Sequence, residues 1–325
     1  MRPVLHLILF LFLLLPSSCS APKKEAADGR RDFGSETPGT QQLSGFGFTD
    51  DDNNPIVIEK PFVRIIPLYG AHVENLFAIG AGDAVIGIPR GTSDPPEAAV
   101  LPVFDYNGDP EYVIAANPDL VLIRPFVRRQ SPLYIAEIER AGITVASLYP
   151  GSFEDFDAYI LKLGMLSGKL SEAEEKLNAF HRELAEIKKR VEGIKERKIV
   201  FFESTENEIR TVTSDSLPAR AIEFAGGINA APSLPPISPG SSIARFGAEN
   251  LLGIADRIDV YVVQQGAMNR TPNLESLKAR PAFSAVNAVQ DGRVLFISEK
   301  YISSVTFQYL EGVKILSEYL YPDLF

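Results

Sequence analysis

One helical stretch divides this chain into two parts of similar character. Apolar side chains recur at helical spacing through residues 151–197, from Phe156 to Val191. On either side of it, short apolar strands alternate with helical segments that end at glycine or proline. Such strands are typical of parallel sheets covered by helices on both faces. The sequence therefore predicts an α/β fold of two lobes, residues 56–150 and 198–325, joined by a single long helical spine.

The length of the chain agrees with this division, because 325 residues are enough for two domains of about 150 residues each. Within the spine, Gly164 and Gly168 weaken the helical pattern. The spine is therefore either one kinked helix or two consecutive helices.

The first 19 residues have the organisation of a signal peptide. Arg2 precedes an apolar run over residues 4–15 that is too short to span a bilayer. Cys19 stands where cleavage would leave it as the first residue, which resembles a bacterial lipobox with a lipidated cysteine. Pro16 stands where that motif prefers leucine. The alternative is an ordinary cleavage site that happens to lie near a cysteine.

Residues 20–55 are polar and contain many glycine, serine and proline residues. Such a segment buries too little apolar surface to fold, so it is expected to be a flexible tether. A plain disordered N-terminus has the same composition. With the lipobox, the tether predicts an extracytoplasmic lipoprotein, in the periplasm or at the cell surface, held to the membrane through a lipid anchor only.

Composition excludes several classes of site and partner. The net charge of −10 argues against nucleic acid, which requires a basic surface. One cysteine excludes a disulfide framework and a cysteine zinc cluster. Three histidines, one of them in the leader, are too few for a multi-histidine metal site. We therefore expect neither a resident metal nor a cofactor.

Several segments, taken in order, resemble a known family. RIIPLYGAHVENLFAIGAGDAVIGI and DPEYVIAANPDLVLI are similar to the N-terminal lobe of the substrate-binding proteins of ABC importers for iron–siderophores and cobalamin. ENLLGIADRIDVYVV and RPAFSAVNAVQDGRVLFISEKYI are similar to their C-terminal lobe. The resemblance covers residues 60–322 and implies a class III periplasmic binding protein, in which two lobes enclose the ligand and a helical spine limits their closure.

The resemblance also implies a partner, a permease dimer with its ATPase. In the family, one glutamate of each lobe meets arginines of the permease, and the matching positions are Glu111 and Glu249. Carboxylates at helix starts are favoured by the helix dipole and stay exposed for a charged partner. Simple compensation of the helix dipole is the alternative explanation for both.

Candidate ligand-binding residues follow the carboxyl ends of the predicted strands, where ligands of such sheets bind. Arginine suits carboxylate or catecholate oxygens, and aromatic rings cover flat apolar parts of a chelate. In this acidic chain the RPFVRR segment therefore favours an anionic ligand. The N-terminal lobe supplies Tyr69, His72, Arg90, Asp105, Tyr106, Arg124, Phe126, Arg128 and Arg129. The C-terminal lobe supplies Ser214, Asp215, Arg245, Gln264, Gln265, Met268, Arg270 and Tyr301.

Two questions stay open at this level. His72 either coordinates haem iron or cobalt, or is a helix-start histidine that bonds to nearby backbone. For the ligand, an iron–siderophore is expected first, a corrinoid second and haem third. No GxSxG, Walker or GxGxxG motif stands in its required context. A binding protein is therefore preferred to the alternatives, an extracytoplasmic enzyme acting on a small molecule in the cleft and a surface receptor without transport.

Overall fold

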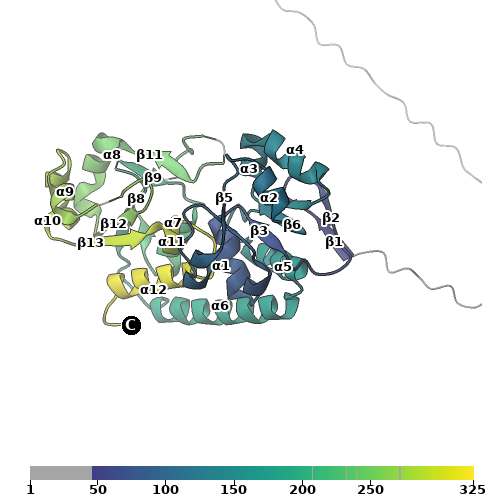
Figure 1. Cartoon of the computed structure of the whole chain (residues 1–325). Helices are drawn as coiled ribbons and strands as arrows, with labels where there is room; N and C mark the ends of the chain where they lie inside the picture. The colour runs from purple at the N-terminus through teal and green to yellow at the C-terminus, as the bar shows by residue number, and fades with distance from the viewer. Residues whose placement is uncertain (1–45, 207, 232, 239, 271) are drawn as a thin grey trace, which may run out of the picture. The chain divides into compact units, whose positions relative to one another are not determined.

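The computed structural model describes residues 46–206, 208–231, 233–238, 240–270 and 272–325. The predicted signal peptide, Cys19 and most of the predicted tether lie outside the described residues. From Gly45 to Phe325 the chain forms one compact unit (Figure 1). In the described part of the chain, no helix combines the length and the apolar character needed to cross a membrane.

The N-terminal lobe is built on parallel strands. Their β-branched and leucine side chains are buried between helices, as is typical of parallel sheets. Strands β3 (Ile65–Pro67), β6 (Leu120–Ile123) and β7 (Thr144–Ser147) form one parallel sheet in that order. Strands β4 (Ile88–Pro89) and β5 (Val103–Phe104) form a second parallel pair. The helices are α1 (Gly70–Ala78), α2 (Glu111–Ala115), α3 (Pro125–Gln130) and α4 (Pro132–Arg140).

The C-terminal lobe repeats this design. Its four parallel strands lie in the order β10 (Ile228–Asn229), β8 (Ile199–Glu203), β12 (Val260–Gln265) and β13 (Val294–Ser298). An antiparallel pair, β9 (Arg210–Val212) and β11 (Ile243–Arg245), lies beside them. The helices are α7 (Leu217–Phe224), α8 (Gly247–Ile254), α9 (Leu274–Lys278), α10 (Asn287–Gln290), α11 (Glu299–Ile302) and α12 (Tyr309–Leu320).

Two consecutive helices form the spine, which resolves the alternative left open by the sequence. They are α5 (Phe156–Ser167) and α6 (Leu170–Val191). Gly168 ends α5 in a left-handed conformation with φ of 70°, which glycine adopts without strain. Gly164 lies against Ala173 of α6, where a side chain would not fit without movement. The two glycines therefore permit the turn and the close packing that follows it.

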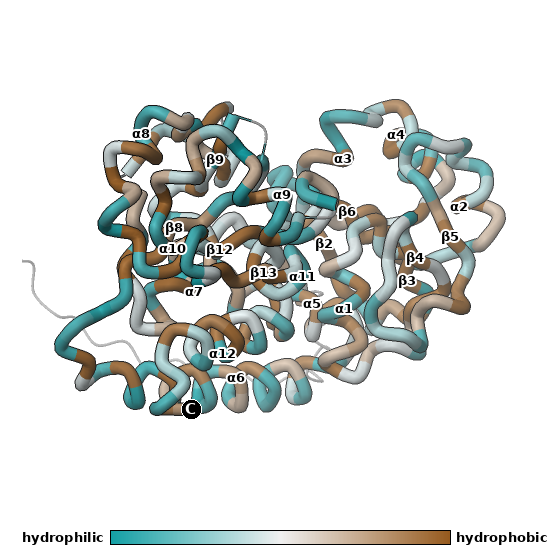
Figure 2. Tube along the Cα trace, turned by 90° about the vertical axis from the view of Figure 1, so that its left-hand side faces the viewer, coloured by the Kyte–Doolittle hydropathy of each residue, from teal (hydrophilic) through white to brown (hydrophobic). Residues whose placement is uncertain are grey.

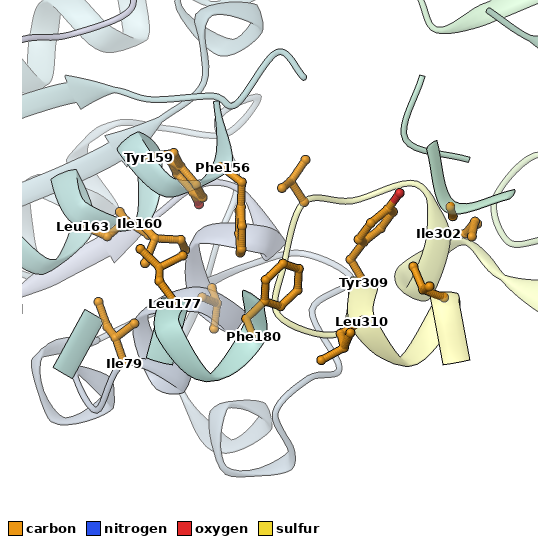
Figure 3. Close-up of a cluster of buried hydrophobic side chains, with 14 of the residues drawn as sticks. Ile79, Phe156, Tyr159, Ile160, Leu163, Leu177, Phe180, Ile302, Tyr309 and Leu310 are labelled. Carbon is orange, nitrogen blue, oxygen red and sulfur yellow. The ribbon is translucent and has the colours of Figure 1, made fainter. Parts of the chain in front are cut away.

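A shared hydrophobic core joins both lobes to the spine. With 22 residues, α6 is about 33 Å long. Hydrophobic and hydrophilic turns alternate along it in Figure 2, and its buried side chains include Leu177, Phe180 and Leu184. Phe180 packs near Phe156 of α5 (Figure 3). It also packs near Phe307, which precedes α12. The core is therefore continuous from the N-terminal lobe, through the spine, into the C-terminal lobe.

The N-terminal boundary differs from the prediction. Strands β1 (Phe46–Thr49) and β2 (Pro55–Ile58) form an antiparallel hairpin, so the predicted tether extends too far into the folded unit. The buried carboxylate of Asp50 accepts hydrogen bonds from Asn54 N and Ser147 N, at 2.7 and 3.0 Å. The acidic turn of this hairpin is thus held by backbone donors at the end of β7. The polar sequence of the turn does not indicate that its carboxylate has partners so far along the chain.

Candidate ligand-binding cleft

A cleft of about 640 Å³ is lined by residues of both lobes, a volume typical of small-molecule sites. Its walls come mainly from loops at the carboxyl ends of parallel strands, as the fold predicts. The N-terminal lobe contributes, among others, Tyr69, Arg90, Thr92, Asp94, Tyr106 and Arg124. The C-terminal lobe contributes, among others, Ser204, Gln264, Met268, Glu299, Lys300 and Ser304.

Arg124 forms the most distinctive part of the N-terminal wall. Its guanidinium lies 4.8 Å from the ring centroid of Tyr69 and 4.9 Å from that of Phe126. Among the described residues, no carboxylate lies within ion-pair distance of it. Burial raises the pKa of the Tyr69 phenol to about 12, so this hydroxyl remains a hydrogen-bond donor. The wall therefore offers a positive charge, a donor and aromatic surface to an anionic ligand.

Three further predicted residues lie around this wall. Arg90 lines the cleft with its side chain 79% exposed, and its Nε donates to Asp105 at 3.1 Å. Asp105 therefore contacts the cleft lining through Arg90. The backbone donor of Asn107 lowers the pKa of the Asp105 carboxyl most, and the bond from Arg90 lowers it further. Tyr106 lines the cleft and meets the Phe126 ring edge-on at 6.5 Å.

His72 does not reach the cleft. It is fully buried, its Nδ1 lies 2.7 Å from the hydroxyl of Tyr159, and its Nε2 lies 3.2 Å from the carbonyl oxygen of Ile123. Burial lowers the pKa of the imidazole to about 4, so it stays neutral. Both ring nitrogens are occupied, and the structure therefore supports the second interpretation, a structural histidine, and not a metal ligand.

Arg128 is also directed away from the cleft, contrary to the prediction. Its Nε lies 3.2 Å from Asp52 and its Nη1 lies 2.9 Å from Glu139. The RPFVRR segment forms helix α3, in which residues two apart face different directions. Phe126 and Arg128 therefore point in different directions: Phe126 lies beside Arg124, which precedes the helix, whereas Arg128 ties the helix to the acidic turn of the β1–β2 hairpin. Arg129 is exposed and is not part of the cleft lining.

In the C-terminal lobe, Gln264 and Met268 line the cleft as predicted, and Ser303 donates to Gln264 at 2.6 Å. Gln265 does not, because successive side chains of strand β12 point to opposite faces. The other predicted residues of this lobe are also absent from the lining: Ser214, Asp215, Arg245 and Arg270 are exposed, and Tyr301 packs against the shared core.

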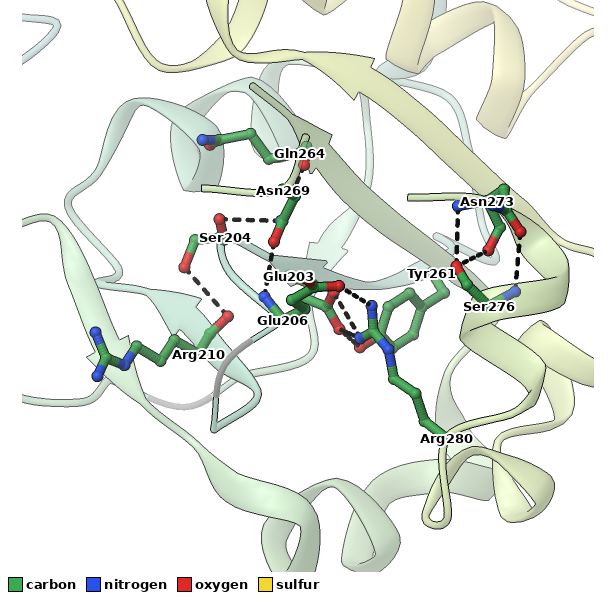
Figure 4. Close-up of polar contacts among 10 residues, drawn as sticks. All are labelled: Glu203, Ser204, Glu206, Arg210, Tyr261, Gln264, Asn269, Asn273, Ser276 and Arg280. Carbon is green, nitrogen blue, oxygen red and sulfur yellow. Dashed lines mark hydrogen bonds and ion pairs between the residues drawn. The ribbon is translucent and has the colours of Figure 1, made fainter. Parts of the chain in front are cut away.

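A buried polar network supports the Met268 loop (Figure 4). Asn269 donates to the carbonyl oxygens of Ser204 and Gln264, at 3.2 and 3.0 Å, and accepts from Glu206 N at 2.8 Å. Next to it, the fully buried Glu203 binds Arg280 at 2.9 Å and accepts from the Tyr261 hydroxyl at 2.6 Å. Asn269 therefore holds the loop against the end of β8, and this places Met268 in the cleft.

Several cleft residues were not predicted. Ser204 directly follows β8, and Lys300, Ser303 and Ser304 follow β13, so the rule that found Tyr69 and Arg124 applies to them too. The chemistry of these small or basic side chains does not distinguish them from the other residues that follow the same strands. Glu74 lies on helix α1, away from any strand end, and no sequence signal marked it.

The two predicted docking residues stand on different lobes. Glu111 begins α2 and Glu249 lies in the first turn of α8, and both side chains are exposed. The backbone N–H of Glu111 donates to the Asp109 carboxylate at 2.9 Å, so the first backbone donor of this helix is satisfied by Asp109 and not by the Glu111 side chain. Their exposure suits both docking and helix-dipole compensation.

Comparison with known proteins identifies the class of this cleft. Residues 65–301, more than half of the chain, match the family described as periplasmic binding protein. The chain belongs to the periplasmic binding protein family. The resemblance drawn from its sequence, to ABC-importer substrate-binding proteins of the iron–siderophore and cobalamin class, is thereby confirmed. The family is one of solute-binding proteins.

This periplasmic binding protein is similar in sequence to relatives with different names. It is 27% identical over 292 residues to the uncharacterized ABC transporter substrate-binding lipoprotein YvrC of Bacillus subtilis, across 88% of this chain and 89% of the relative. It is 28% identical over 172 residues to a vitamin B12-binding protein of Vibrio parahaemolyticus, across 52% of this chain and 62% of the relative.

Solved structures confirm the predicted α/β fold class. The periplasmic haem-binding protein RhuT of Roseiflexus superposes with a TM-score of 0.66 at 21% identity, across 81% of this chain and 99% of that chain. The vitamin B12-binding protein BtuF of Vibrio cholerae superposes with a TM-score of 0.61 at 20% identity, across 80% of this chain and 97% of that chain.

Proposed function

We propose that this periplasmic binding protein captures an organic metal chelate in the cleft between its lobes and delivers it to the permease of an ABC importer. The observation that carries the proposal is Arg124 of the cleft lining, whose guanidinium lies 4.8 Å from the ring centroid of Tyr69, which also lines the cleft, and 4.9 Å from that of Phe126, which does not. A flat chelate with anionic oxygens satisfies both the guanidinium and the rings. The metal is cargo in this proposal, and the protein itself needs no cofactor.

An iron–siderophore or a corrinoid is the preferred ligand, ahead of haem. The relatives whose names state a ligand are vitamin B12-binding proteins, so they favour the corrinoid more strongly than the sequence did. The C-terminal wall also supports a ligand with many neutral polar groups, because it presents serine and glutamine side chains such as Ser204, Gln264 and Ser304.

The test is calorimetric titration of the purified protein with cyanocobalamin, ferric enterobactin and haemin. We expect one of these probes to bind, and Arg124→Ala to weaken that binding about 10- to 100-fold, since a partly desolvated charge-assisted contact is lost. The matched control is Arg140→Ala, because Arg140 is an exposed arginine of α4 that pairs with Glu137 outside the cleft. Equal affinities of the two variants would contradict the role of Arg124, and no binding of any probe would contradict the chelate.

Attachment and delivery complete the proposal. Cys19 provides the lipid anchor on the extracytoplasmic side of the membrane, which agrees with the description of YvrC as a lipoprotein. Glu111 and Glu249 provide one carboxylate per lobe for basic residues of the permease, because both are exposed at helix starts.

A further inference from the structure

Glu74 occupies an unusual place between two hollows. It belongs to α1 of the N-terminal lobe and lines the cleft. It also lines a second hollow of about 510 Å³ on the other side, together with Phe77, Glu97 and Lys176. Its Oε2 accepts a hydrogen bond from Gln308 Nε2 of the C-terminal lobe at 3.0 Å. Glu74 is therefore part of the cleft floor, at a point where the two lobes touch.

The charges around Glu74 leave it without a positive partner. Lys300, which also lines the cleft, pairs with Asp94 at 3.5 Å. Among the described residues, no lysine or arginine lies within ion-pair distance of the Glu74 carboxylate. Burial raises the pKa of this carboxyl to about 7, and the charge of Asp94 adds to the effect, whereas a hydrogen bond from Thr306, the charge of Lys300 and a hydrogen bond from Gln308 oppose it. The protonation of the Glu74 carboxyl therefore depends on the ligand atoms that cover it.

Ligand capture would remove the remaining water from this carboxyl. A carboxylate that loses its water without a new partner is costly, so it must either bind a proton or receive a hydrogen bond. A ligand edge that carries only carboxylates would meet Glu74, Asp94 and Glu299, which also lines the cleft. The cleft floor therefore favours a ligand edge with hydrogen-bond donors, whereas the wall around Arg124 favours an anionic edge.

We propose that Glu74 is a ligand-recognition residue whose carboxylate accepts a hydrogen bond from an amide or ammonium N–H on the deepest edge of the ligand. The inference rests on the proposed function and narrows its ligand class. The chelate carries N–H donors, as a corrinoid does in its side-chain amides, in addition to any anionic group that meets Arg124. A chelate edged by carboxylates alone, such as haem, fits the floor poorly.

The experiment compares Glu74→Gln with Glu97→Gln, which makes the same change in the second hollow but outside the cleft. The probes are cyanocobalamin, with amide donors, ferrioxamine B, with an ammonium group, and haemin, with carboxylates and no such donors. At pH 8, we expect Glu74→Gln to lower the affinity for a donor-bearing probe about tenfold, provided that the unmodified protein binds this probe. Glu97→Gln should change the same affinity less than twofold.

The pH dependence adds a readout that a purely structural role would not produce. Between pH 6 and 8, affinity for a donor-bearing probe should rise as the carboxylate forms, affinity for haemin should fall, and both slopes should flatten in Glu74→Gln. The charged and titratable groups facing Glu74 stay unchanged in this comparison; they are Tyr69, Asp94, Glu97, Tyr159, Lys176 and Lys300.

The outcomes separate the two proposals. If the protein binds a probe but Glu74→Gln behaves like Glu97→Gln in affinity and slope, the role of Glu74 is refuted and the chelate proposal stands. If haemin alone binds, the donor requirement is refuted. If no probe binds the unmodified protein, the chelate proposal fails, and the role of Glu74 fails with it.

Discussion

His72 shows how one buried side chain responds to pH at the residue scale. Its imidazole is neutral in the folded protein because burial lowers its pKa to about 4. The unfolded chain, with an ordinary histidine pKa of about 6.5, binds a proton earlier as the pH falls. Stability from this residue is therefore complete above pH 6.5 and is lost as the pH falls toward 4.

We expect His72→Leu to lower the free energy of unfolding by about 1 to 3 kcal/mol at pH 7.5, because Tyr159 and the Ile123 carbonyl lose their partner. The difference from the unmodified protein should shrink by about 2 kcal/mol at pH 5, since the variant has no imidazole to protonate on unfolding. Urea denaturation at the two pH values measures both quantities. A difference that stays constant with pH would contradict a buried neutral imidazole.

Single residues also show what the sequence could predict about the site. Tyr69, Arg90, Arg124 and Met268 were found because strand ends and residue chemistry suffice to place them at the cleft. Arg128 was assigned wrongly because its partner, Asp52, lies 76 positions earlier in a segment expected to be unfolded. Burial of His72 depends on three chain segments that meet only in the folded protein, and no local pattern contains that information.

At the scale of elements, the ends of β8 and α9 are joined by one buried ion pair. Glu203 ends β8 with no solvent exposure, and Arg280 follows α9 and contacts both of its carboxylate oxygens at 2.9 Å. Breaking such a pair by removing one partner leaves an uncompensated buried charge. The pair therefore ties the residue after α9 to the end of β8.

We expect Arg280→Met to lower the free energy of unfolding by about 3 to 5 kcal/mol, and the double variant Glu203→Gln/Arg280→Met to recover part of this loss. A double-mutant cycle by urea denaturation measures the coupling. Arg140→Met serves as the control, because Arg140 pairs with the exposed Glu137 at the surface. If the double variant is less stable than Arg280→Met, the loss does not arise from an unpaired Glu203.

Element boundaries were predicted less evenly than the element order. Helices with clear stop signals, such as α1 and α4, lie where the glycine and proline pattern indicates. The β1–β2 hairpin was missed because its Asp-Asp-Asp-Asn-Asn turn looks like linker sequence, and its pairing with the end of β7 is not encoded locally. Helix α3 was not predicted, since its first residues, Pro125 and Phe126, do not form an apolar stripe.

At the scale of the whole molecule, delivery requires that both lobes meet the permease together. We expect Glu111→Lys and Glu249→Lys each to reduce ligand uptake in cells about tenfold or more while leaving ligand affinity unchanged, because each reversal opposes a basic partner surface. Glu275→Lys is the matched control, an exposed first-turn glutamate of α9. Undiminished uptake in the Glu111→Lys/Glu249→Lys double variant would show that docking uses other residues.

The continuous aromatic core described for α5, α6 and the segment before α12 has a consequence for how the molecule gains its stability. Phe156, Phe180 and Phe307 come from the spine and the C-terminal lobe, yet they pack in one cluster with Ile79 and Leu76 of the N-terminal lobe. If one lobe unfolded alone, the other lobe would lose its contacts in this shared cluster. We therefore expect the two lobes to unfold in one cooperative transition, although each also has a core cluster of its own and they are organised like two domains.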